Sequence, residues 1–250
     1  MVTMETFSRA PITEALLDIQ AVLPEAVDTA RLLAYHDLVK DRFPEKRDRL
    51  SWSQGFHWRV GQQPEVMPVA QKLEGYLFVS PDKTKIVQAR VNGFTFNKLK
   101  PYETWEKLSQ EAKGLWEQYR GLATPVNVSR VGLRCLNRIE IPLPVGDPKQ
   151  FCLLFPDLPP EMPQAITEFF QRCVVRDSES GSLGVVTLTF EPYQQASTVL
   201  ALILDIDVFY QFDATPPDTT QLWQKLDMLH DLKNRIFFSS LTENAKRLFR

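Results

Sequence analysis

The sequence predicts an α+β fold in which antiparallel sheets, or one large curved sheet, carry long helices packed on one face. Extended segments with apolar residues at every second position are joined by short turn signals, which is typical of antiparallel strands. Other segments have apolar residues at the spacing of one helical face. No strand–helix–strand order recurs, so we do not expect a parallel sheet. We also expect an internal duplication of a hairpin-plus-helix unit.

The N-terminal elements are expected in the following order. A first strand covers residues 12–23, where apolar residues alternate with a partly polar set. A helix is expected over 25–43, because its apolar residues recur at helical spacing. A long strand is expected over 85–99, with a bulge marked by Asn92-Gly93. The other elements expected before residue 142 are strands at 51–60, 74–80 and 126–141 and a helix at 101–121.

Seven prolines between residues 142 and 163 mark the best candidate for a connection between two parts of the chain. We therefore expect an N-terminal α+β half at 1–143 and a C-terminal α+β half at 144–250, either separate or joined in one continuous domain. The elements expected in the C-terminal half are a helix at 164–170, strands at 172–176, 183–191 and 197–212, a long helix from 218 and a short helix at 242–250.

Two similar tetrapeptides support the expected duplication. Trp105-Glu106-Lys107-Leu108 and Trp223-Gln224-Lys225-Leu226 each follow a strand, a turn, a long strand and a proline. The two units would then be equivalent, with 85–99 matching 197–212 and the two tryptophans matching each other. The alternative is that both helices simply need a tryptophan and a leucine on their buried faces.

Composition and charge narrow the function classes. The 250 residues carry a formal net charge of −2, so no overall positive field favours nucleic acid or anionic lipid as a partner. The first ten residues contain no apolar stretch typical of a signal peptide. The longest apolar run is far shorter than the roughly 20 residues that span a membrane. We therefore expect a cytoplasmic protein that does not bind a membrane, and nucleic-acid binding ranks third among the functions considered.

No motif of a known catalytic, metal or cofactor site is present, and the three cysteines contain no CxxC pair. His36, His57 and His230 have no carboxylate or cysteine partner at the spacing of metal or catalytic ligands, so we interpret them as packing or surface residues. His230 lies one residue from the apolar stripe of the last long helix. The members of that stripe are Leu222, Trp223, Leu226, Leu229, Lys233 and Ile236. No catalytic residue, metal or cofactor is predicted.

Several predicted strands carry charged residues on one face and apolar residues on the other. In the strand at 126–141 the apolar face has one exception, Asn137. If these strands pair side by side, their arginines and carboxylates lie close together. The tentative ligand-binding residues are Glu14, Asp18, Arg130, Arg134, Arg138, Asp205 and Asp207.

Three interpretations of this charged face remain open. The simplest is a sheet surface with cross-strand ion pairs in solvent. A polar ligand pocket is the second, and a catalytic or metal site is the third, although the arginines would compete with a metal ion for the carboxylates. We further predict that Glu14 or Asp18 lies within ion-pair reach of Arg134 or Arg138, on the helix-covered side of the sheet.

The chain also resembles a sporadically distributed family of prokaryotic cytoplasmic proteins of about this length whose members are uncharacterised. The segments that carry the resemblance are Ala10-Pro11-Ile12-Thr13-Glu14-Ala15, Asp18-Ile19, Asn92-Gly93-Phe94, Phe96-Asn97, Leu99-Lys100-Pro101-Tyr102, Trp105, Gly132-Leu133-Arg134, Asn137-Arg138-Ile139, Asp205-Ile206-Asp207, Leu229-His230, Lys233-Asn234, Phe237-Phe238 and Leu241-Thr242. Cys135 stands where the family commonly has a tyrosine. The resemblance implies no established activity, and its patchy distribution is associated with mobile or defence-type gene cassettes.

Two functions are expected from these observations. The first is a non-enzymatic binding or interaction protein, such as the regulatory or neutralising partner in a mobile or defence-type gene cassette, acting through a protein partner or self-association. The second is an enzyme or binder of an anionic small molecule, whose phosphate or carboxylate Arg134 and Arg138 hold, because arginine binds such groups through two hydrogen bonds.

Overall fold

A computed structural model describes residues 5, 7–53, 56–57, 65–66, 70–164, 166–190, 198–213 and 218–250. The strands are β1 (Ile12–Val22), β2 (Glu45–Ser53), β3 (Phe56–His57), β4 (Glu65–Val66), β5 (Ala70–Val79), β6 (Lys85–Arg90), β7 (Gly93–Leu99), β8 (Asn127–Pro142), β9 (Phe170–Arg176), β10 (Leu183–Phe190) and β11 (Val199–Gln211). The helices are α1 (Thr29–Leu33), α2 (Tyr35–Val39), α3 (Trp105–Ala123), α4 (Thr219–Ser240), α5 (Glu243–Arg247) and the 3₁₀ helix η1 (Pro148–Gln150). The side chain of His57 and the predicted strand ends at 58–60, 191 and 197 lie outside the described residues.

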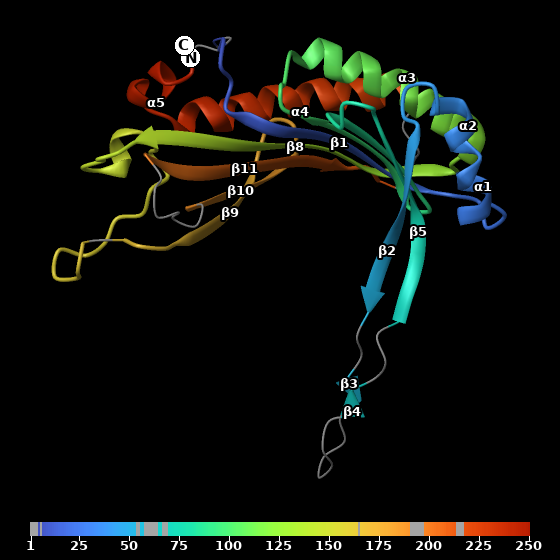
Figure 1. Cartoon of the computed structure of the whole chain (residues 1–250), viewed down its shortest axis with the longest axis horizontal. Helices are drawn as coiled ribbons and strands as arrows, with labels where there is room; N and C mark the ends of the chain where they lie inside the picture. The colour runs from blue at the N-terminus through green and yellow to red at the C-terminus, as the bar shows by residue number, and fades with distance from the viewer. Residues whose placement is uncertain are drawn as a thin grey trace.

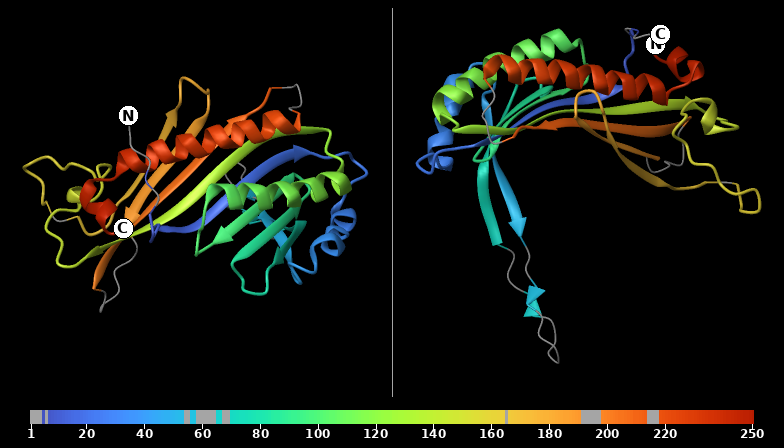
Figure 2. Two further views of the ribbon diagram at one scale, coloured as in Figure 1. Left: turned by 90° about the horizontal axis from the view of Figure 1, so that it is seen from above. Right: turned by 180° about the vertical axis from the view of Figure 1, so that it is seen from behind.

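One nine-stranded sheet dominates the fold (Figure 1). Its strand order is β2-β5-β6-β7-β1-β8-β11-β10-β9, and every pairing in it is antiparallel, as the sequence predicted. β3 and β4 form a separate two-stranded pair. The paired strands β2 and β5 bend away from the side on which α3 and α4 lie (Figures 1 and 2).

The core lies between the sheet and the helices. On β1, Leu17 and Ile19 are fully buried, and their cross-strand neighbours Phe96 and Phe94 are buried beside them. Phe94 contacts Trp116 of α3 in an edge-on arrangement with ring centroids 5.8 Å apart. We call this side the helix-covered face. Since side chains alternate along a strand, the intervening residues form the opposite face, which we call the polar face.

Local capping explains where the two main helices begin. The side chain of Thr104 accepts a hydrogen bond from the backbone of Lys107 at the start of α3. Asp218 and Gln221 form a reciprocal capping box at the start of α4. α4 then packs across β8 and β11, while α3 packs on β7 (Figure 2).

The predicted fold class is wrong. A single large antiparallel sheet forms most of the molecule, and only α3 and α4 are longer than five residues. The helix expected at 25–43 is divided at Ala34, where short i to i−3 hydrogen bonds replace helical ones. The described residues of the helix expected at 164–170 form no helix.

The long strand expected over 85–99 is in fact the hairpin of β6 and β7. Gly93 begins β7 with a φ of +142°, and a Cβ atom there would collide with the carbonyl of Ile19. The sequence signal at Asn92-Gly93 therefore marks a reversal of the chain and not a bulge. This adds a strand that the predicted topology lacked.

The predicted equivalence of the two tetrapeptides is also wrong. Trp105 is the first residue of α3, whereas Trp223 lies in the second turn of α4. The indole nitrogen of Trp105 donates to Asp227 at 2.9 Å, but that of Trp223 is buried and has no partner within the described ranges. The two parts of the sheet do share one topological feature. In each, the strand before the helix pairs with an earlier strand: β7 before α3 pairs with β1, and β11 before α4 pairs with β8.

Strands from both predicted halves belong to the same sheet. β8 of the segment 1–143 is hydrogen-bonded to β11 of the segment 144–250 over thirteen residue pairs. The proline-rich stretch between the segments leads from β8 to β9, which forms the far edge of that sheet.

Candidate functional site

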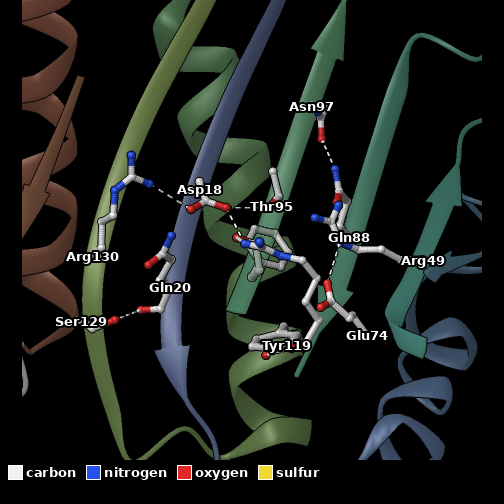
Figure 3. Close-up of polar contacts among 12 residues, drawn as sticks. Asp18, Gln20, Arg49, Glu74, Gln88, Thr95, Asn97, Tyr119, Ser129 and Arg130 are labelled. Atoms are coloured by element: carbon white, nitrogen blue, oxygen red, sulfur yellow. Dashed lines mark hydrogen bonds and ion pairs between the residues drawn. The ribbon is translucent and has the colours of Figure 1, made fainter. Parts of the chain in front are cut away.

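The centre of the polar face is Asp18 (Figure 3). Its side chain is largely buried, and its Oδ1 atom accepts hydrogen bonds from Arg90 and, at 2.7 Å, from Thr95. The Oδ2 atom accepts from Nη1 of Arg130 at 3.2 Å. Two arginines and one hydroxyl therefore donate hydrogen bonds to the carboxylate of Asp18. These donors come from β6, β7 and β8.

Arg130 extends this network towards β11. Its second amino group lies 3.5 Å from Oδ2 of Asp207, and its guanidinium lies over the ring of Phe209 at 4.2 Å. Burial raises the pKa of the Asp207 carboxyl above its ordinary value, although Arg130 and Arg134 act in the opposite direction.

Arg134 and Asp205 form a separate pair. Two nitrogens of Arg134 donate to the two carboxylate oxygens at 2.8 and 2.5 Å. These hydrogen bonds raise the pKa of the Arg134 guanidinium further. Arg138 donates to Glu140 on its own strand. The strand arginines therefore already have carboxylate partners within the chain.

Glu14 is connected to Arg49 on the edge strand β2 by a chain of hydrogen bonds through two neutral side chains. Asn97 donates to Glu14 at 2.6 Å, Gln88 donates to Asn97 at 3.0 Å, and Arg49 donates to Gln88 at 2.5 Å. Arg49 can only donate, so the oxygen of Gln88 must face it, and this sets the donor direction along the whole chain of bonds. Figure 3 shows the part of this chain of bonds between Asn97 and Arg49.

The predicted ion pair between Glu14 or Asp18 and Arg134 or Arg138 is therefore wrong, and so is its expected place on the helix-covered side. Asp18 lies opposite Gly132 on β8, and Arg134 lies opposite Leu16. Asp18 consequently reaches the diagonal neighbour Arg130. The charged residues lie opposite the helices because the apolar positions of the same strands are the ones that α3 and α4 bury.

A second polar cluster lies on the helix-covered face, in a cavity of about 250 Å³ that we call the Lys233 pocket. Its polar core consists of Asn137 on β8 and His230, Lys233 and Asn234 on α4. The residues that enclose it include Pro11, Tyr102, Trp105, Phe237 and Phe238. Asn137 is buried, and its amide donates to the carbonyls of Cys135 and Leu204.

A directed chain of hydrogen bonds connects these residues. The ammonium of Lys233 donates to Oδ1 of Asn234 at 2.5 Å, and this fixes the orientation of the amide. The Asn234 amide nitrogen then faces Nε2 of His230 at 3.0 Å, so Nε2 must accept. The imidazole proton therefore resides on Nδ1, which is buried and has no hydrogen-bond partner in the part of the chain that the structure describes.

The Lys233 pocket contains a buried positive charge that no nearby negative charge in the described chain compensates. Lys233 is only 6% exposed, and no carboxylate in the described chain lies within ion-pair distance of it. Burial, and then the charge of Lys233, lower the pKa of His230 to about 4, so the imidazole is neutral at pH 7. Two acids at the rim, Glu5 and Glu103, are paired with Arg250 and Lys107.

Glu106 is the remaining acid at this rim. Its carboxyl has a pKa below the ordinary value, first because of a hydrogen bond with its own backbone and then because of one with Thr104. It also interacts with His230 through space. A ligand in the pocket would thus meet an ammonium at the base and a carboxylate at the rim.

Sequence reasoning missed this pocket, although three signals for it were present. Lys233 stood in the apolar stripe of the last helix, Asn137 stood in the apolar row of β8, and His230 lay beside the stripe. Each was interpreted alone. Only packing of α4 on β8 brings them together.

A metal site, a membrane-spanning helix and similarity to known proteins would also bear on function. Among the residues that the structure describes, no three His, Cys, Asp or Glu side chains are grouped as a metal site. None of the helices in the described chain is both long and apolar enough to cross a membrane. Neither known protein-family models nor curated proteins gave a match to this sequence. The resemblance to a sporadic prokaryotic family therefore stays a prediction.

Proposed function

We propose that this chain is a binding protein for a small molecule with a carboxylate or phosphate group, which Lys233 holds in the Lys233 pocket. The observation that carries the proposal is the buried ammonium, which has one neutral hydrogen-bond partner among the described residues. An ammonium has three donors, and burying it without an opposite charge is costly. A bound anion would supply both the missing charge and the missing acceptors.

His230 supports the same ligand chemistry. Its Nδ1 proton is a second donor without an acceptor among the described residues, and buried donors in native proteins rarely lack one. The stacked ring of Trp105 offers an apolar wall beside these donors. A cavity of about 250 Å³ lies just below the usual size of ligand pockets, so it suits a small anionic ligand.

The strand arginines fit this role less well. Arg134 and Arg138 would have to release Asp205 and Glu140 before binding an external anion. Lys233 has no such competitor among the described residues. The anion binding expected from the sequence is accordingly proposed for the other face of the sheet.

Thermal-shift and calorimetric titrations test the proposal with inorganic phosphate, acetate, succinate and citrate as probes. A ligand at about 100 times its dissociation constant adds about 2.7 kcal/mol of stability. Lys233→Met should abolish this stabilisation while retaining the apolar stem. Lys113→Met is the matched control, because Lys113 is exposed on α3, and it should respond like the wild type.

A second comparison concerns the rim. Glu106→Gln removes a negative charge near the bound anion and should tighten binding of inorganic phosphate. Stabilisation by the probes that survives in Lys233→Met would show that they bind elsewhere, and the proposal would then be wrong.

An interaction protein is the second candidate function. It is favoured by the exposed apolar residues of β9, an edge strand with only one neighbouring strand in the described chain. A co-purification experiment from the native host, with the full chain as bait, would identify such a partner.

A further inference from the structure

The two edges of the nine-stranded sheet differ in character. β2 begins with five consecutive charged residues, Glu45 to Arg49, which discourage pairing with another strand. β9 forms the opposite edge (Figure 1) and has no such run. Phe170 and Val174 on this strand are 71% and 55% exposed. An exposed edge strand of seven residues, four of them apolar, is a surface that can pair with another strand.

A groove accompanies this edge on the helix-covered face. It has a volume of about 500 Å³ and lies between β9 and α4. Cys173 and Val175 line it from the strand, and Leu232 and Ile236 line it from the helix. A strand added beside β9 would therefore extend the sheet and also cover apolar surface on this face.

We infer that the occupant of this edge is a second copy of the chain, paired antiparallel through β9 about a two-fold axis at Cys173. Such an axis runs perpendicular to the sheet, so both copies keep their helices on the same side. Even-numbered residues of one copy then lie opposite even-numbered residues of the other, and odd-numbered opposite odd-numbered. Because Cys173 is the middle residue of β9, all seven residues can pair.

In this register no two arginines of the paired β9 strands lie directly opposite each other. Arg172 lies opposite Val174 of the second copy, and Arg176 lies opposite Phe170 of the second copy, where a guanidinium can stack on the ring. Shifting the register by two residues in one direction places Arg172 opposite itself. Shifting it in the other direction places Arg172 opposite Arg176. Directly opposed like charges destabilise a sheet, so the centred register is favoured.

Sedimentation velocity of the full chain tests this inference. The wild type should form a dimer in a concentration-dependent way. Val174→Lys places a lysine opposite Arg172 of the second copy and should shift the chain to monomer. Val126→Lys is the matched control, because Val126 is equally exposed but far from β9, and it should remain dimeric.

A double variant tests the register itself. In Arg172→Glu with Val174→Lys, each lysine faces a glutamate of the second copy, so dimerisation should return. The centred register also places the exposed thiol of Cys173 beside its own copy, while Cys135 and Cys152 are buried. A short bis-maleimide should therefore link two wild-type chains, and Cys173→Ser should prevent it.

Three results would overturn the inference. One is a wild type that remains monomeric at its highest soluble concentration. Another is a Val174→Lys variant that dimerises as well as the wild type. The third is a double variant that stays monomeric after Val174→Lys alone has abolished the dimer.

Discussion

Trp105 stacks on His230, with ring centroids 4.8 Å apart and planes inclined by 16°. The contact joins the first residue of α3 to the middle of α4, and the hydrogen bond from Trp105 to Asp227 reinforces it. The indole shields the imidazole from water. This shielding contributes to the burial that keeps His230 neutral.

Stability should therefore depend on pH through His230. Its pKa is about 4 in the folded chain and about 6.5 when unfolded, so the unfolded state binds more protons between these values. Stability from this group is complete above pH 6.5 and falls as the pH drops to 4. One pKa unit corresponds to about 1.4 kcal/mol, and partial exposure reduces the total to about 2 kcal/mol.

Urea unfolding of the wild type and His230→Gln between pH 7 and 4 measures this effect. Glutamine cannot become charged in this range, so the difference in unfolding free energy between the two proteins should shrink by about 2 kcal/mol on acidification. Parallel pH profiles for the two proteins would assign the loss of stability to carboxylates elsewhere.

Lys233→Met should stabilise the ligand-free protein. The substitution removes a buried ammonium and keeps a side chain of similar length, so we expect a gain of about 1–3 kcal/mol. Denaturation without added anion gives this value. A large loss of stability would instead indicate that Lys233 serves a structural role.

Asp18→Asn should be strongly destabilising. It leaves Arg90 without its carboxylate partner and leaves Arg130 with Asp207 alone, and removing one partner of a buried ion pair costs about 3–5 kcal/mol. Asp37→Asn is the matched control, since Asp37 pairs with Lys40 in solvent. Its cost should stay below about 1 kcal/mol.

Arg134→Ala is expected to cost about 1 kcal/mol or less, because the Arg134 side chain is 51% exposed. Chemical denaturation measures the change. A cost similar to that of Asp18→Asn would show that the Arg134–Asp205 pair is as strongly shielded from solvent as the Asp18 network.

Gly93→Ala should destabilise the sheet by about 2 kcal/mol or more. Alanine strains a backbone with a φ of +142°, and its Cβ collides with the neighbouring strand. Gly114→Ala on α3 is the control, because no atom lies near the added methyl group. It should instead gain about 0.5–1 kcal/mol from helix propensity. Equal effects of the two substitutions would contradict this explanation.

The sequence by itself determined the strands β1, β8 and β11, the antiparallel pairing, and the presence of helices at α3 and α4. Alternation along β1, β8 and β11 separates apolar from polar residues, and this pattern depends only on backbone geometry. The helix beginning at Asp218 was equally visible, because its cap and apolar stripe are local. Even Asn137 and Lys233 could be recognised as departures from their patterns.

Only the tertiary structure decided how these elements combine. It made a hairpin of 85–99, put Asp18 within reach of Arg90 and Arg130, and placed His230 and Lys233 of α4 over Asn137 of β8. Strand register and helix placement depend on contacts between residues far apart in the chain. Periodicity shows which face of each element is polar, but it does not show which other element will pack against that face.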